Sequence, residues 1–551
     1  MINSGFWQSL IKVLPTALKD KRQLVNITET FTYDALSFDI SKGQKHTEAY
    51  SFLWKLGMVT RNVEPSLEQP SVTEGPSSRF YRTVWRWHFY AGLFVVPFMV
   101  MLGITGIIYL FKPQLDTAMY HNLMFVQPSG SLLPYTEQVE AVQAAYPGAT
   151  VSKFIPNEAA DRSAEVIVAT ADARSLEVFV DPYVGQVLGV RDEEKNLQAI
   201  ARKIHGDLLI GNWGDYLIEL AACWAIVLLI SGIYLWFPRR SISVMGTFIP
   251  RLWSKNKRIF WRDLHAVPGF YGVLLIGFLL ITGLPWTGFW GDTFAQVWGR
   301  FPDKMWDNVP QSSLVTGSLN EQGTLFVPWA AEQMPIPLST LPDSTLPEST
   351  LPEARLVVDH SRHGTEKTDA VSQKIPDVFN QVVATAIAQG APPGFNITFP
   401  EGETGVYTAS AFPNDPKQEI TIHMDQYSGT VLASVGWKDY GLVPKAVELG
   451  VSIHMGKYFG LANQLVMLFA ALVTILLAIT GTVMWWKRRP KGSGLIGAPP
   501  MPPYVQNWRV PVAIVAVLGL ALPLMGLSLV IVLLLDYFVI SRTTILRRLF
   551  G

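Results

Sequence analysis

The sequence predicts a polytopic α-helical membrane protein that carries two soluble α+β modules on one side of the membrane. Three observations predict this class: apolar residues gather in long runs, basic residues cluster at some run ends, and the two halves of the chain repeat the same spacings. The predicted repeat is a transmembrane helix, an α+β module and a second transmembrane helix. A C-terminal hydrophobic hairpin or single span follows the second copy.

The apolar runs account for the transmembrane prediction. Hydrophobic residues make up 49% of the 551 residues and charged residues only 16%, whereas about a quarter of a typical soluble domain is charged. A bilayer core of about 30 Å requires roughly 20 apolar residues in a helix. Most of the five runs meet that length; they cover residues 89–111, 217–237, 267–284, 461–486 and 510–540.

Basic residues set the expected orientation. Arginine and lysine cluster before the first run, between the second and third runs, and after the fourth. Because such residues stay in the cytoplasm, we expect a multi-pass protein of the bacterial inner (plasma) membrane with a cytoplasmic N-terminus. No apolar core follows Met1 closely, so the first span is expected to act as its own insertion signal.

These signals give the expected domain boundaries. The expected cytoplasmic parts are an N-terminal extension (1–80) and a basic loop (241–262). The four spans are expected at 81–111, 205–240, 263–290 and 454–489. The periplasmic parts are module 1 (112–204), a segment with a linker (291–375) and module 2 (376–453), and the C-terminal hairpin or fifth span takes 490–551.

Each periplasmic module has the pattern of one helix and several strands. The expected elements are residues 137–146, 165–170, 176–180 and 186–190 in the first module, and 378–389, 406–411, 419–423 and 430–435 in the second. The turns before the last strands are related, because Asp181-Pro-Tyr-Val-Gly185 and Asp425-Gln-Tyr-Ser-Gly429 both lead into a Val-Leu pair.

Histidines occupy equivalent places in the two halves. His88 and His265 stand near the start of the first and third spans, and an Ile-Thr-Gly element ends 18 residues after each of them. His205 and His454 come just ahead of the second and fourth spans, and a Ser-Gly or Thr-Gly pair ends 27 residues after each. Because four matched spacings are improbable by chance, we predict a tandem duplication.

Three regions lie outside the repeat. Residues 311–372 include a five-residue repeat rich in Pro, Ser and Thr, which predicts a flexible linker. The last run, 510–540, is too long for one straight span. Pro523 and Gly526 at its middle favour a short hairpin, although one tilted span also fits. Residues 1–80 predict a cytoplasmic extension with an amphipathic helix near 6–18.

The four repeated histidines are the candidate cofactor-binding residues. Since odd-numbered spans run outward and even-numbered spans inward, His88 and His265 are expected near the cytoplasmic face, and His205 and His454 near the outer face. Two imidazoles at one level between helices suit bis-imidazole ligation of an iron porphyrin. We therefore predict all four as haem-iron ligands; no catalytic residue is assigned.

Other interpretations of these residues are open. A histidine at a membrane interface can also cap a helix start, and a zinc or copper site would need three or four converging ligands. Glycines near the histidines, such as Gly92 and Gly269, leave room for a flat macrocycle or for close helix packing. The remaining histidines are interpreted as surface residues: His46, His121, His360, His363 and His423. Cys223, the only cysteine, excludes disulfides within the chain and is interpreted as a packing residue.

These features together resemble the PepSY-associated transmembrane family. The resemblance rests on the histidine-led spans with Ile-Thr-Gly, the Asp-x-x-x-Gly-x-Val-Leu turn of both modules, His205-Gly206 and Leu264-His265-x-x-x-Gly269, over about residues 80–490. Characterised members include inner-membrane ferric-siderophore reductases. The resemblance implies PepSY-like modules, two haem b groups on His88, His205, His265 and His454, and an electron conduit in iron acquisition.

The expected function is therefore a membrane-embedded dihaem reductase that passes electrons to a periplasmic acceptor such as a ferric chelate. No G-x-G-x-x-G or P-loop motif follows a strand, so a membrane quinol or a cytoplasmic flavoprotein is the expected donor. The lipid bilayer is a further expected partner, and no nucleic acid is expected to bind. Aromatic residues are candidates for lining the acceptor site or for an interfacial belt: Trp213, Trp286, Trp290 and Tyr458.

Two other functions remain open. A membrane-anchored PepSY protein without redox activity would bind or regulate a partner, and its matched histidines would have no task. A transporter built from repeats would usually need polar or charged groups in the middle of the membrane. The spans offer almost none beyond Thr105, Ser231, Thr282 and Thr480.

Overall fold

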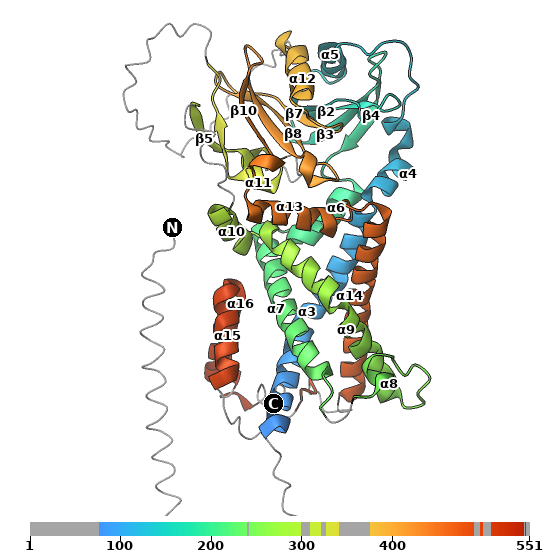
Figure 1. Cartoon of the computed structure of the whole chain (residues 1–551), viewed down its shortest axis with the longest axis vertical. Coiled ribbons are helices and arrows are strands. Elements are labelled where there is room, and N and C mark those ends of the chain that lie inside the picture. Colours follow the sequence, from blue (N-terminus) through green and yellow to red (C-terminus); the bar gives the residue numbers. More distant parts are fainter. Residues whose placement is uncertain are drawn as a thin grey trace, which may run out of the picture. The chain divides into compact units, whose positions relative to one another are not determined.

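The computed structural model describes residues 76–239, 242–298, 309–320, 327–340, 375–489, 496–499, 509–540, 542–544 and 546. The helix predicted near 6–18 lies outside these residues, as do His46, His360 and His363. Figure 1 shows a helical bundle with a layer of strands at one end. We call this end the sheet side, and the opposite end, which carries α8 (Val244–Thr247), the loop side.

Four long helices form the bundle: α3 (Pro76–Leu110), α7 (Asn212–Trp236), α9 (Lys257–Gly283) and α14 (Leu461–Arg488). Each is long and apolar enough to cross a membrane. Helices α3 and α9 each pack against both α7 and α14, so the four helices form a closed ring. A buried apolar layer joins them: Val95, Met99, Ala225, Ile276, Leu280 and Val473.

The second and fourth spanning helices begin later than the sequence suggested. His205 lies in a separate amphipathic helix, α6 (Leu197–Asp207), and His454 ends α13 (Leu442–His454). Left-handed backbone separates these helices from α7 and α14, at Leu208 and Leu209 (φ 56° and 61°) and at glycines in the second loop. Such a conformation ends a helix, so the two histidines sit on sheet-side helices beside the bundle.

The C-terminal tail forms a helical hairpin of α15 (Arg509–Ala521) and α16 (Pro523–Leu535). A Cβ placed on Gly526 would lie 2.7 Å from the carbonyl oxygen of Gly519, so the two backbones touch. Residues seven apart in one continuous helix would be separated by roughly 10 Å. The turn between the helices therefore folds the chain back, which agrees with the hairpin alternative.

The hairpin turn packs against the bundle. Leu522 and Met525 are buried in one cluster with Cys223 of α7 and Leu284. Trp224 of α7 also donates its indole N–H to the Ser528 hydroxyl (3.1 Å). Cys223 is therefore a buried packing residue, as predicted.

Eight of the described strands form an antiparallel sheet in the order β10-β9-β8-β7-β1-β2-β3-β4. Its strands are β1 (Thr150–Ile155), β2 (Ala164–Ala169), β3 (Ser175–Val180), β4 (Val187–Asp192), β7 (Asn396–Thr398), β8 (Val406–Ala411), β9 (Ile420–Asp425) and β10 (Val431–Gly436). The join is β1 with β7, where Phe154 pairs with Ile397. The two modules thus share one sheet; β1 and β7, the joining strands, are absent from the sequence prediction.

The two faces of the sheet differ in polarity. Helices α5 (Tyr135–Ala145) and α12 (Val378–Ala388) cover the face away from the bundle, where an apolar core spans both modules. The face toward the bundle carries buried polar side chains such as Glu177, Thr408 and His423. His423 is 1% exposed and bonded to Thr408 (2.9 Å). The interpretation of His423 as a surface residue is therefore wrong, because strand alternation turns it into the protein.

Part of the predicted linker is folded. Strands β5 (Gln311–Val315) and β6 (Pro335–Pro337) pair with each other, and the short helices η3 (Thr316–Asn320) and α11 (Trp329–Glu332) lie between them. Trp329 and its neighbours are buried against β10 and α10 (Trp290–Trp298). Apolar residues at 327–334 thus give this stretch a core. The five-residue repeat lies almost entirely outside the described residues.

Candidate functional site

Each of the four candidate histidines bonds to a hydroxyl group on a neighbouring helix. In every case the bond involves Nδ1 of the imidazole. The pairs are His88 with Ser231 (2.8 Å), His205 with Thr105 (3.0 Å), His265 with Thr480 (2.9 Å) and His454 with Thr282 (2.8 Å).

The hydroxyl protons are already engaged in other bonds. Each hydroxyl donates to the backbone carbonyl four residues earlier in its own helix. These bonds run from Ser231 to Val227 (2.7 Å), Thr105 to Met101 (2.8 Å), Thr480 to Leu476 (2.7 Å) and Thr282 to Phe278 (2.7 Å). Because a hydroxyl has one proton, its oxygen is an acceptor for the imidazole.

This arrangement selects one tautomer of each imidazole. A proton on Nδ1 satisfies the hydroxyl oxygen, and Nε2 then keeps its lone pair. A neutral imidazole with a fixed Nδ1–H and a free Nε2 lone pair is the form in which histidine binds a metal.

A glycine follows each of the four hydroxyl residues and lies against the bonded ring. A Cβ would lie 3.4 Å from Cε1 of His88 at Gly232, and 3.5 Å from Cε1 of His205 at Gly106. Gly481 and Gly283 stand in the same relation to His265 and His454, at 3.5 and 3.7 Å. These glycines therefore make room for imidazoles. By contrast, leucines of α7 and α14 lie nearest to Gly92 and Gly269.

The histidines come together as two pairs, and each pair has one histidine from each half of the chain. His88 lies near His265, and His205 lies near His454. His88 and His265 lie near the loop-side ends of α3 and α9, whereas α6 and α13 place the other pair at the sheet side. The structure thus brings together the same residues that the sequence paired by topology.

The chemistry of this donor set fits two iron porphyrins. Each site offers two neutral imidazoles from different helices, with the tautomer fixed for binding through Nε2. Among the described residues, no three or more His, Cys, Asp or Glu side chains converge as a metal site. A dedicated zinc centre in this part of the chain would need such a group.

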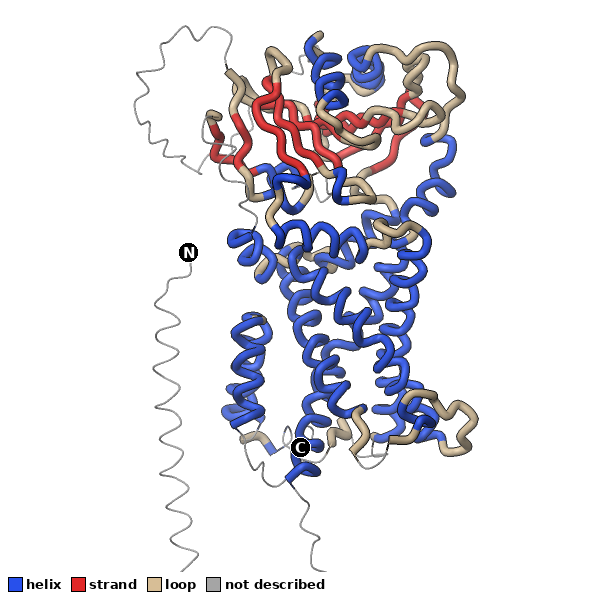
Figure 2. The backbone as a smooth tube through the Cα atoms, viewed as in Figure 1, coloured by secondary structure: helices blue, strands red, loops and turns tan. Residues whose placement is uncertain are grey.

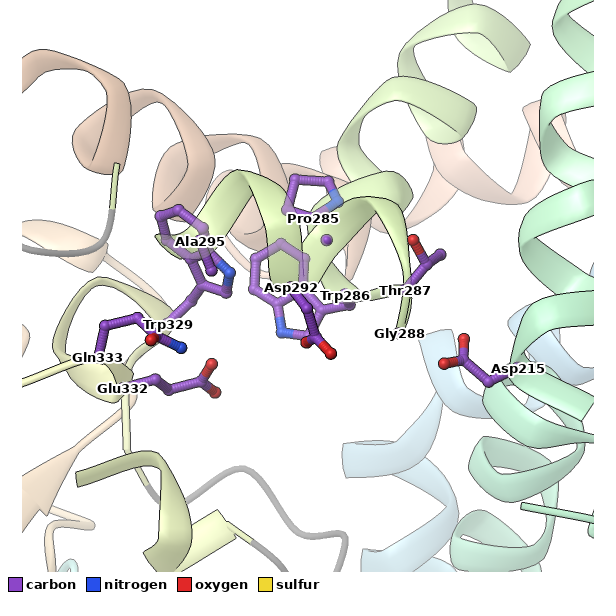
Figure 3. A pocket seen from close by; sticks show the side chains of 11 residues that line it. Asp215, Pro285, Trp286, Thr287, Gly288, Asp292, Ala295, Trp329, Glu332 and Gln333 are labelled. Atoms are coloured by element: carbon purple, nitrogen blue, oxygen red, sulfur yellow. The ribbon is translucent and has the colours of Figure 1, made fainter. Parts of the chain in front are cut away.

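A pocket opens at the sheet side close to the second histidine pair. Its volume is about 220 Å³, and it is lined by residues of α7, α10, α11 and η1 (Leu284–Trp286). Figure 3 shows the carboxylates of Asp292 and Glu332 directed into the same open space, with Asp215 across from them. Helix η1 directly follows Gly283, the residue beside the His454 ring.

The pocket combines acidic groups with indole rings. Burial raises the pKa of Glu332 to about 7, and repulsion from Asp292 adds to the increase. Trp286 and Trp329 form part of the wall, and the buried indole N–H of Trp286 has no partner among the described residues. The described residues that line the pocket include no basic side chain, so this wall suits a ligand that carries positive charge and an oxygen acceptor.

The four aromatic residues suggested for an acceptor site have different positions. Trp286 lines the pocket, whereas Trp290 donates its indole N–H to the Ala521 carbonyl (3.0 Å). Trp213 is 76% exposed, as expected for an interfacial residue, and Tyr458 lies beside the exposed Lys417. Trp329 was not anticipated, because it falls in the segment interpreted as a linker.

The sequence also marks the residues whose hydroxyl groups bond to the histidines. Each stands directly before the matched glycine, as Thr105-Gly106, Ser231-Gly232, Thr282-Gly283 and Thr480-Gly481. The spacing from histidine to glycine was clear from the sequence. The bond to an imidazole of another helix was not, because it depends on how the helices pack.

Comparison with known proteins identifies the family. The family model described as the PepSY-associated TM region matches residues 85–488, which include all four histidines and their hydroxyl partners. Comparison with curated proteins gives no match. The chain therefore belongs to the PepSY-associated transmembrane family and is a multi-pass membrane protein.

Proposed function

We propose that this PepSY-associated transmembrane protein is a dihaem reductase of the inner membrane. His88 and His265 would hold one haem b near the cytoplasmic face, and His205 and His454 a second near the periplasmic face. When bound, haem supplies one-electron redox chemistry. The observation that carries the proposal is the shared hydrogen bonding of the four imidazoles, since all four present Nε2 for metal binding.

The protein residues have three tasks in this function. The four hydroxyls orient the imidazoles and hold the proton on Nδ1. The buried apolar layer of the bundle, with Val95, Ile276 and Val473, separates the two histidine pairs and excludes water between them. The proposed tandem duplication explains why each half supplies one histidine to each pair.

We further propose that the acceptor binds at the sheet side, in the pocket next to η1. A periplasmic ferric chelate such as a siderophore fits this place, because reduction weakens the chelate and releases the metal. The carboxylates of Asp292 and Glu332 favour an acceptor with positive charge. The electron donor would be a membrane quinol or a cytoplasmic flavoprotein, reaching the histidine pair of the loop side.

Haem content tests the proposal directly. Protein purified in detergent, from cells with ample haem, should give two haems per chain in a pyridine haemochrome assay. Its dithionite-reduced spectrum should show b-type bands. Colourless protein under these conditions would instead support a binding or regulatory function without redox activity.

A further inference from the structure

Two buried carboxyl groups meet between the sheet and α13. Glu419, directly before β9, is 3% exposed, and Glu448 of α13 is 0% exposed. One oxygen of Glu448 accepts from the backbone N–H of Ala330 (2.9 Å). The two carboxyl groups are close enough for each to shift the pKa of the other. Both oxygens of Glu419 and the second oxygen of Glu448 have no hydrogen-bond partner among the described residues.

This burial favours the protonated acids. A buried carboxylate without a hydrogen-bond donor is costly, so the two groups are accommodated more easily when they are neutral. Burial raises the pKa of Glu419, and the neighbouring Glu448 raises it further. Burial also raises the pKa of Glu448. With pKa values of about 10 for Glu419 and about 8 for Glu448, both carboxyl groups are protonated at neutral pH, and the pair loses its first proton near pH 8 and titrates as a unit.

The groups around the pair supply little positive charge. Within the described part of the chain, Lys457 is the cation that acts on both acids, and burial together with Lys112 lowers its own pKa to about 8. The other titratable neighbours in the described residues are acidic or phenolic: Glu332 of α11, Asp415 directly before η4 (Pro416–Gln418), Asp439 of η5 (Trp437–Asp439) and Tyr440. The Tyr440 hydroxyl is buried and has no partner in the described part of the chain.

A second pair of buried acids serves as a comparison, because an arginine neutralises it. Glu165 of β2 and Glu177 of β3 also meet within the protein. There, Nε of Arg191 lies 2.6 Å from Glu177, and Arg191 also reaches Asp116 (3.4 Å). A guanidinium stays charged at any ordinary pH, so this pair has a permanent counter-charge. Among the described residues, the cation that acts on both Glu419 and Glu448 is Lys457, which loses its charge near pH 8.

The Glu419–Glu448 pair lies close to the periplasmic haem site proposed above. Glu448 precedes His454 by six residues in the same helix, which corresponds to a rise of about 9 Å. Lys457, which acts on both acids, follows His454 by three residues. In a buried region of low dielectric, a change of one charge over such a distance shifts the protonation of a carboxyl group.

We infer that Glu419 and Glu448 form a redox-linked proton site. The pair takes up one proton from the sheet-side solvent when one electron arrives at the His205/His454 site. It releases that proton when the electron leaves for the acceptor. The electron and the proton enter together and leave together, so the net charge of the buried region does not change. The inference rests on the proposed haem function, whose donor supplies the electron.

The test is the pH dependence of the haem midpoint potential in holoprotein, measured by spectroelectrochemistry from pH 6 to 10, with the steepest slope expected above pH 8. The periplasmic haem is identified as the one that the His205→Ala variant loses. Its potential should fall with rising pH, by up to about 59 mV for each tenfold fall in proton concentration. Glu419→Gln and Glu448→Gln, measured singly, should each reduce this slope by at least half. Glu165→Gln, in the pair with the arginine, should leave the slope unchanged.

The possible results separate this inference from the proposed function. Protein that binds two haems but shows a flat potential would overturn the inference alone. An unchanged slope in both glutamine variants would assign the proton to other groups and would also overturn it. Protein without haem would overturn both proposals. If one variant does not fold, the other variant and the wild-type slope still decide the question.

Discussion

Oγ1 of Thr480 lies 2.9 Å from Nδ1 of His265 and donates its own proton to the Leu476 carbonyl 2.7 Å away. The threonine can therefore only accept from the imidazole, and it fixes the ring with Nε2 free. The helix supplies this geometry because a threonine hydroxyl bonds readily to the carbonyl four residues back. The same relation recurs at the other three histidines.

Thr480→Val should weaken haem binding at the His88/His265 site. Valine keeps the shape of threonine but removes the acceptor for the Nδ1 proton, so the ring loses its fixed tautomer. Loss of such a partner typically lowers metal affinity by about 10- to 100-fold. Haem titration into apoprotein measures the effect. Thr474→Val is the matched control, because Thr474 makes the same helical bond to Ala470 (2.9 Å); equal loss in both variants would refute the role of Thr480.

The two histidine pairs should be separable by mutation. His88→Ala and His265→Ala should each remove the same haem, because each leaves one imidazole without its counterpart. His205→Ala and His454→Ala should remove the other. Reduced-minus-oxidised spectra of the single variants identify the haem that remains. If His88→Ala and His205→Ala removed the same haem, the pairing by level would be wrong.

Arg191→Met should destabilise the sheet side of the protein. The variant would leave the buried Glu165–Glu177 pair and Asp116 without their guanidinium. Breaking a buried ion pair typically costs about 3–5 kcal/mol. The free energy of unfolding in urea measures this loss. Arg174→Met removes only an exposed pair with Asp172 and should cost less than about 1 kcal/mol. A similar cost for both variants would contradict the structural role of Arg191.

Binding of a cationic chelate should depend on pH through Glu332. Burial raises the pKa of this group to about 7, so it is negatively charged above pH 7 and neutral below. Reoxidation of reduced protein by a cationic ferric chelate should therefore slow as the pH falls from 8 to 6. In the Glu332→Gln variant, reoxidation should be slow at every pH from 8 to 6, and its rate should no longer depend on pH. Glu140→Gln, at an exposed position of α5, is the control; an identical pH profile in Glu332→Gln would exclude the pocket.

The sequence predicts much of the helical part, because the length of an apolar run and the spacing of residues within it are local properties of the chain. Four spanning helices, the helix-plus-strand order of the modules and Cys223 as a packing residue follow from such patterns. Strands β1 and β7 were missed, since β7 has only three residues and both lie at the join of the modules. Their pairing depends on two segments more than 200 residues apart.

The candidate site likewise contains residues that the sequence predicts and residues that depend on how distant segments pack. Its histidines follow from the repeat, but their hydroxyl partners depend on which helices become neighbours. Glu419 and Glu448 lie on a strand end and a helix of the same module, and no short motif joins them. Trp329 lies in a stretch whose neighbours suggest a linker, although local apolar residues give it a core.

The last prediction concerns the direction of electron flow. Basic residues predict that the sheet side faces the periplasm, and the pocket and the His205/His454 pair both lie on that side. A membrane-impermeant ferric chelate outside right-side-out vesicles should therefore reoxidise the reduced haems without entering. His205→Ala should keep a reducible haem at His88/His265 but reoxidise slowly, because the site nearest the pocket is lost. Stopped-flow absorbance in the Soret region measures both rates. Normal reoxidation in His205→Ala would place the exit elsewhere, and reactivity confined to inverted vesicles would reverse the proposed flow.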